Sequence, residues 1–149
     1  MRTVSRLLLS SLVIAFAAGA LQIGLAAESL MLRAGDATGP NVVFAFDKEA
    51  NHHRIVVRTT QVGVVGSKIE VFVDRAKTPA FRHVFPSTEC KFGESGSECE
   101  VIVPASSPDY VAVLAQFKRG RVARVTVDDA GVMKMDQTAS LKGFTKSLR

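Results

Sequence analysis

Apolar and polar residues alternate along much of the chain beyond residue 40. The alternation is clearest at residues 68–74, where Ile69, Val71 and Val73 fall on one face and mostly polar residues on the other. Residues 121–128 repeat this pattern. A period of two is typical of a β-strand with one face buried. Both stretches are therefore predicted to be half-buried strands.

Less regular β patterns mark further stretches of the chain. They lie at residues 41–46, 54–60, 80–85, 98–103 and 132–136. The first two flank a polar turn and are expected to form a hairpin. Met133 and Met135 are expected to face the core from the last one. Residues 110–117 are apolar on both faces, which predicts a central strand that is covered on both sides.

The period changes at the C-terminus. Leu141, Phe144 and Leu148 are spaced i, i+3 and i+7, which predicts a short helix with one apolar stripe and with Ser140 as its N-cap. Short strands followed by a terminal helix predict a mainly β fold, an antiparallel β-sandwich or partial barrel. We assign residues 41–149 to a single β-rich domain and residues 28–40 to a flexible lead-in.

The N-terminal 27 residues have the layout of a secretory signal peptide. Arg2 and Arg6 precede an almost wholly apolar run at residues 7–18, and small residues follow. Cleavage after Ala20 fits the small-x-small rule best, whereas cleavage after Ala27 falls where the sequence turns polar. We favour Ala27, and we expect the protein to be periplasmic or secreted.

An uncleaved membrane anchor is the alternative, because residues 7–27 approach the length that spans a bilayer. After cleavage no transmembrane segment is expected. Loss of Arg2 and Arg6 lowers the formal net charge from +5 to +3. This charge is compatible with an anionic partner surface but does not require a nucleic-acid partner, and none is predicted.

The chain contains two cysteines, Cys90 and Cys99. In an exported protein such a pair predicts one disulfide. A metal or redox site is the rival interpretation, but it normally needs closer cysteine spacing or further ligands. Cys99 alternates in phase with Val101 and Val103, so it is expected on the core side of its strand.

Three histidines are the remaining candidates for chemistry. His52 and His53, with Asp47, or His83 further along the chain, suggest a zinc or copper site. Adjacent residues on a strand point to opposite faces, so the pair is poorly placed to chelate one ion. We therefore predict no metal, no cofactor and no catalytic residues, and we interpret these histidines as turn and strand residues.

Basic residues cluster around a predicted turn near the C-terminus. The cluster comprises Lys118, Arg119, Arg121 and Arg124, and Lys142, Lys146 and Arg149 add charge on the terminal helix. The functional interpretation is contact with an anionic surface, such as lipid headgroups or an acidic protein patch. The alternative is a solvated hairpin whose charges discourage pairing at a sheet edge.

The C-terminal half also resembles a known family. Its cysteine pair around a Gly-containing loop, the F-K-R-G-R-V-A run and the S-L-K-G-F sequence at residues 140–144 resemble the invasion-associated locus B family. The resemblance covers about residues 68–149. It implies a small β-rich domain exported to the cell envelope, with Cys90 and Cys99 as a structural pair, and it implies no catalytic residues.

These features predict an exported, non-enzymatic envelope protein with a binding or structural role. The family resemblance adds a possible link to host-cell invasion or colonisation. Two alternatives belong to other classes: a metal-dependent or hydrolytic envelope enzyme that uses the histidines, and a carrier of a small ligand or lipid with an apolar pocket inside the sandwich.

Overall fold

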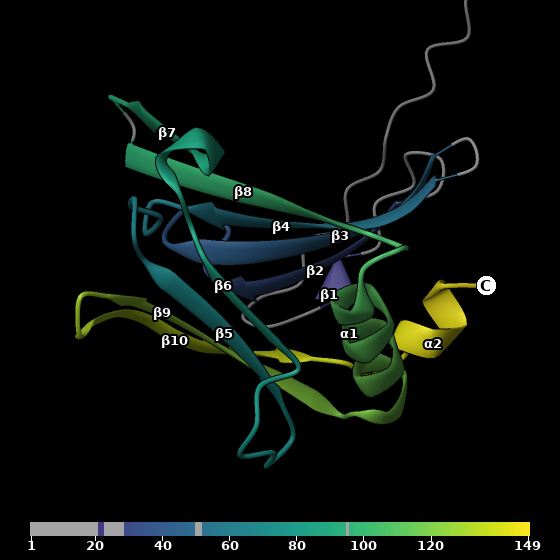
Figure 1. Cartoon of the computed structure of the whole chain (residues 1–149). Helices are drawn as coiled ribbons and strands as arrows, with labels where there is room; N and C mark the ends of the chain where they lie inside the picture. The colour runs from purple at the N-terminus through teal and green to yellow at the C-terminus, as the bar shows by residue number, and fades with distance from the viewer. Residues whose placement is uncertain (1–20, 23–28, 50–51, 95) are drawn as a thin grey trace, which may run out of the picture.

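The alternating stretches form two antiparallel sheets in the computed structural model, which describes residues 21–22, 29–49, 52–94 and 96–149. Within these residues, one sheet has six strands in the order β1-β2-β3-β4-β8-β7, and the other has four in the order β10-β9-β5-β6. Figure 1 shows the two sheets facing each other. The predicted mainly β, antiparallel fold is confirmed.

The strands and helices have the following bounds: β1 (Leu21–Gln22), β2 (Ser29–Gly35), β3 (Asn41–Glu49), β4 (His52–Thr60), β5 (Lys68–Val73), β6 (Phe81–Val84), β7 (Cys90–Gly93), β8 (Gly96–Pro104), α1 (Pro108–Arg119), β9 (Val122–Asp129), β10 (Val132–Ser140) and α2 (Phe144–Ser147). A short 3-10 turn, Ser87–Glu89, precedes β7.

The hairpin of β3 and β4 is confirmed, with Asn41 opposite Thr60 and Phe44 opposite Val57. The expected flexible lead-in is wrong for β2, which pairs with β3 along its whole length. Leu30, Leu32 and Ala34 alternate into the core there. Met31 and Arg33, which lie between these positions, are half-buried on the other face of the strand. Because Met31 is apolar, the sequence does not show a clear alternation here.

The predicted signal peptide, residues 1–27, lies outside the described residues except for β1. Leu21 and Gln22 pair with Leu32 and Met31 of β2. Both predicted cleavage positions, after Ala20 and after Ala27, also lie outside the described residues. In the part of the chain that is described, no helix has the length and apolar character needed to cross a membrane.

The four-stranded sheet follows the sequence pattern closely. Ile69, Val71 and Val73 of β5 are buried, as are the inward residues of β9. The expectation for β10 is half wrong, because Met135 is buried whereas Met133 is 52% exposed. The β9–β10 register shifts between these two residues. A β-bulge of this kind turns one side chain out of the alternation.

The stretch at residues 110–117 is a helix rather than the predicted central strand. Ser107 caps α1 by accepting a hydrogen bond from the Asp109 backbone N–H, and Pro108 occupies its first turn. Val113 and Phe117, four residues apart, are buried, whereas Val111 is 61% exposed. Only one face of α1 is covered by the core. The strand prediction was wrong because it relied on apolar content alone, whereas Ser107 and Pro108 mark the start of a helix.

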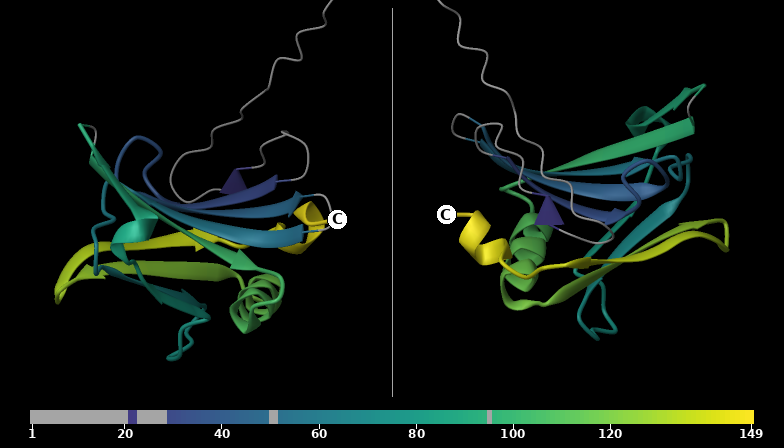
Figure 2. Two further views of the ribbon diagram at one scale, coloured as in Figure 1. Left: turned by 45° about the horizontal axis from the view of Figure 1, so that its top comes forward. Right: turned by 180° about the vertical axis from the view of Figure 1, so that it is seen from behind.

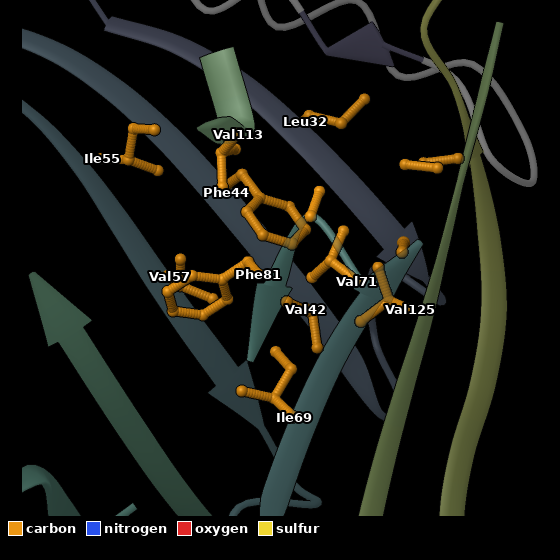
Figure 3. Packing of buried hydrophobic residues seen from close by; sticks show 14 of the residues in the cluster. Leu32, Val42, Phe44, Ile55, Val57, Ile69, Val71, Phe81, Val113 and Val125 are labelled. Carbon is orange, nitrogen blue, oxygen red and sulfur yellow. The ribbon is translucent and has the colours of Figure 1, made fainter. Parts of the chain in front are cut away.

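The interior between the sheets is filled by side chains from both sheets and both helices. Figure 3 shows residues from β2, β3, β4, β5, β6 and β9 pointing toward one another, with Val113 reaching in from α1. An aromatic cluster fixes the helical end, where the Phe117 ring lies 5.6 Å from Phe44 and 5.5 Å from Phe144. The Phe46 and Phe144 rings are 4.9 Å apart. These contacts anchor α1 and α2 to the core.

The terminal helix is shorter than predicted. Ser140 is the last residue of β10 rather than an N-cap, and its hydroxyl accepts the Lys142 backbone N–H at 3.2 Å. Gly143 precedes α2 with a φ of 84°, a left-handed conformation that favours glycine. The predicted apolar stripe is present, because Leu141 and Phe144 are buried and Leu148 packs against the core.

Candidate functional site: a basic recess beside the two helices

The strands β7 and β8, which carry the two cysteines, form a hairpin that reaches the end of the molecule opposite α1 and α2 (Figures 1 and 2). Cys90 of β7 and Cys99 of β8 face each other across the hairpin and form the predicted disulfide. Cys99 is fully buried and lies on the core side with Val101, as predicted. A Cβ at Gly63 would lie 2.8 Å from the Cys99 sulfur, so this side of the disulfide is tightly packed.

The described residues at the tip of the loop between the two strands are exposed. Gly93 and Gly96 are exposed, and Ser95 lies outside the described residues. Phe92 of β7 is 65% exposed next to this tip. The described part of the hairpin therefore presents an exposed aromatic side chain beside a covalent bond between its strands.

The histidines are separated in the structure. His83 of β6 is half-buried, and its Nε2 lies 2.5 Å from the Glu89 carboxylate. Its ring packs between Phe81 and Phe85. Among the described residues no three histidine, cysteine or acidic side chains gather to form a metal site. The contacts of His83 indicate a packed strand residue that is held by one carboxylate.

The His52 and His53 pair lies on β4, opposite the end of β3. The His53 side chain is exposed, and its carbonyl accepts the Ala105 backbone N–H at 2.9 Å. Asp47, the predicted companion of this pair, lies 3.4 Å from the Arg54 guanidinium. The structure therefore shows Asp47 in an ion pair.

The predicted basic cluster divides into paired and unpaired members. Arg124 of β9 makes two hydrogen bonds, of 2.8 and 2.6 Å, to the Asp136 carboxylate of β10. These bonds are the main reason why the pKa of Arg124 is raised and the pKa of Asp136 is lowered. Arg119 donates from Nε to the Ala115 carbonyl, which closes the end of α1. Arg124 thus has its own counter-ion.

The other two members, Lys118 and Arg121, line a surface recess of about 670 Å³ together with Lys142 and Lys146. We call this feature the basic recess. Ser140 and Thr145 add hydroxyl groups to its lining, and none of the described residues that line it is acidic. The sequence cluster therefore identified half of the charged lining. It placed Lys142 and Lys146 on the terminal helix without showing that the fold brings them to Lys118 and Arg121.

Three connections hold the wall of the basic recess in place. The Leu141 backbone N–H donates to the Arg121 carbonyl at 2.8 Å, which joins the end of β10 to the start of β9. The Thr145 hydroxyl donates to the Lys118 carbonyl at 3.1 Å, which joins α2 to α1. Phe144, on the same turn, is buried in the aromatic cluster. The four cations thus stand on segments fixed by hydrogen bonds and by the core.

None of the four cations forms a salt bridge within the described part of the chain. Asp74 interacts electrostatically with Arg121, and its carboxylate accepts the backbone N–H groups of Arg121 and Val122. These bonds hold the pKa of Asp74 below its ordinary value, with a smaller contribution from the Arg121 charge. Asp74 therefore stays ionised, but it lies outside the lining of the basic recess.

Comparisons with known proteins leave the site to be interpreted from its own geometry. No family model, curated protein or solved structure matches this chain. The basic recess offers cationic and hydroxyl groups, with the buried residues Leu141 and Phe144 beside them, and its described lining contains no acidic group. Such a lining binds anions by charge and hydrogen bonding. Sequence reasoning missed Ser140 and Thr145, and its assignment of Ser140 to a helix cap pointed away from this role.

Proposed function

We propose that this protein is an exported, non-enzymatic envelope protein that binds an anionic partner through the basic recess. The observation that carries the proposal is the convergence of four cations on one hollow, where the described residues supply neither an acidic lining nor a salt bridge; they are Lys118, Arg121, Lys142 and Lys146. Unpaired cations that share a concave surface raise the local positive potential and attract anions. The N-terminal signal pattern, the disulfide and the family resemblance support export and an envelope location.

An anionic envelope surface is the partner that this arrangement fits best. Each lysine or arginine near an anionic membrane contributes about 1 kcal/mol to binding. Removing three recess lysines is therefore expected to weaken the binding free energy by about 3 kcal/mol. This corresponds to a loss on the order of 100-fold in vesicle affinity at low salt. Because these charges are exposed, the attraction should also weaken as salt increases.

The test is co-sedimentation with vesicles that contain phosphatidylglycerol, with neutral phosphatidylcholine vesicles as the reference. The recess variant replaces Lys118, Lys142 and Lys146 by Gln. A matched control replaces three exposed lysines elsewhere, Lys48, Lys77 and Lys91, by Gln, which changes the net charge equally.

The proposal predicts that wild type and the matched control bind anionic vesicles, whereas the recess variant binds on the order of 100-fold more weakly. Equal losses in both variants would show that net charge, rather than the basic recess, drives binding. Absence of wild-type binding to anionic vesicles would refute the proposal.

A further inference from the structure

The size of the basic recess limits what can occupy it. Its volume of about 670 Å³ lies within the range of small-molecule sites, roughly 300 to 1,000 Å³. A single inorganic anion is far smaller than this. The volume therefore fits an anionic group that is attached to a carrier of sugar or headgroup size.

The donors that line the basic recess point to a particular anion. Arg121 offers a planar guanidinium that can donate two parallel hydrogen bonds to one oxyanion, and the lysines act as point charges. The Ser140 hydroxyl accepts the Lys142 backbone N–H, and its own proton has no acceptor among the described residues. Several donors around one hollow suit a ligand with several acceptor oxygens on one atom.

The charge balance distinguishes between anion classes. A phosphomonoester carries a charge of about −1.5 to −2 at pH 7 and three acceptor oxygens. A phosphodiester or a carboxylate carries a single charge and two such oxygens, so it leaves more of the four cations uncompensated. A monoanion neutralises one positive charge, and the basic recess presents four. A dianionic group therefore matches the charge of the basic recess better.

The C-terminal carbonyls of α1 would oppose an anion if they faced the basic recess unpaired, because a helix ends with partial negative charge. Two of the last four are occupied, because Gln116 O accepts the Gly120 backbone N–H and Lys118 O accepts the Thr145 hydroxyl. Hydrogen bonds within the protein therefore satisfy these oxygens, and the cations determine the sign of the site.

From this arrangement we infer that the basic recess recognises a phosphomonoester group on a headgroup-sized or sugar-sized carrier, rather than diffuse negative charge. This inference rests on the proposed function and names the chemical class of its ligand. A lipid headgroup and a soluble sugar phosphate or glycerol phosphate share this chemistry. Replacing Arg121 by Lys separates hydrogen-bond geometry from charge. A lysine at this position keeps the positive charge but cannot donate two parallel hydrogen bonds as the guanidinium does.

The experiment compares vesicles that contain phosphatidic acid, a phosphomonoester, with phosphatidylglycerol vesicles, a phosphodiester, adjusted to equal surface charge. A second arm titrates soluble glycerol 3-phosphate by calorimetry. Each arm uses wild type, Arg121→Lys, and Arg75→Lys as a charge-preserving control at an exposed arginine outside the basic recess.

We expect wild type and Arg75→Lys to prefer phosphatidic acid at least fivefold, and Arg121→Lys to lose most of this preference while still binding both vesicles. Glycerol 3-phosphate binding that is reduced by Arg121→Lys would identify a soluble ligand as sufficient, whereas binding to phosphatidic acid alone would identify a membrane headgroup. Equal binding of wild type to both vesicles would overturn the inference and leave the proposed function standing. Absence of binding to either vesicle would overturn both.

Discussion

Replacing Cys90 by Ser removes the covalent link across the β7–β8 hairpin with little other change. Cys90 is half-buried, so a hydroxyl is tolerated there, whereas Cys99 remains fully buried in its packed position. Thr59 still joins β4 to β8, because its hydroxyl hydrogen-bonds the Cys99 backbone N–H and carbonyl at 3.2 and 3.3 Å. The variant is therefore expected to fold, with the loss confined to the cross-link.

The disulfide closes a loop of about ten residues, and the chain-entropy relation gives about 2.7 kcal/mol for such a loop. With an unfolding entropy of about 2.1 cal/mol/K per residue and a domain of about 120 residues, this loss lowers Tm by about 10 °C. Urea unfolding followed by circular dichroism measures the free energy directly, and reduced wild type serves as the control for the same lost link.

Two results would refute this reasoning. The first is a loss of less than about 1 kcal/mol in both Cys90→Ser and reduced wild type, which would mean that the cross-link restricts the unfolded chain far less than the loop-entropy relation requires. The second is rapid alkylation of both thiols in native, unreduced protein, which would mean that the bond is not formed.

Three further predictions test other parts of the structure. Phe117→Ala should lower the free energy of unfolding by about 3–5 kcal/mol and Val111→Ala by less than about 0.5, because only Phe117 faces the core; equal losses in urea unfolding would contradict the helix. Asp74→Asn should destabilise the protein above the ordinary aspartate pKa of about 3.9, and the difference from wild type should shrink as the pH falls through the lowered native pKa; a difference that is independent of pH below about 3.9 would contradict the charge-dependent role. Arg124→Gln should leave binding to anionic vesicles nearly unchanged, because Asp136 already neutralises that arginine; a tenfold loss would contradict this assignment.

The sequence predicted the fold wherever one rule governed a segment. Residues 68–74 and 121–128 largely alternate, with Phe72 and Val122 as apolar exceptions on the polar faces, and each stretch forms a strand with its predicted face buried. The phase of Cys99 relative to Val101 correctly placed the disulfide on the core side. In these segments the local pattern and the tertiary packing agree, so local reasoning was sufficient.

The prediction failed where burial depends on partners far away in the sequence. Residues 110–117 read as a strand because the sequence does not show that only one side of α1 meets the core. The basic recess was not predicted for the same reason. Its four cations come from two stretches of the sequence, and only the fold brings these together. The pairing of Arg124 with Asp136 was visible only once β9 and β10 were in register.

The most direct test of the account is to map the ligand contact by NMR on the ¹⁵N-labelled protein titrated with glycerol 3-phosphate and with short-chain phosphatidic acid. The account predicts that the largest changes in amide chemical shift fall at Gly120, Arg121 and residues 142–146, with the Cys90–Cys99 hairpin at the opposite end unaffected. Changes centred on that hairpin, or spread evenly over basic residues across the surface, would contradict it.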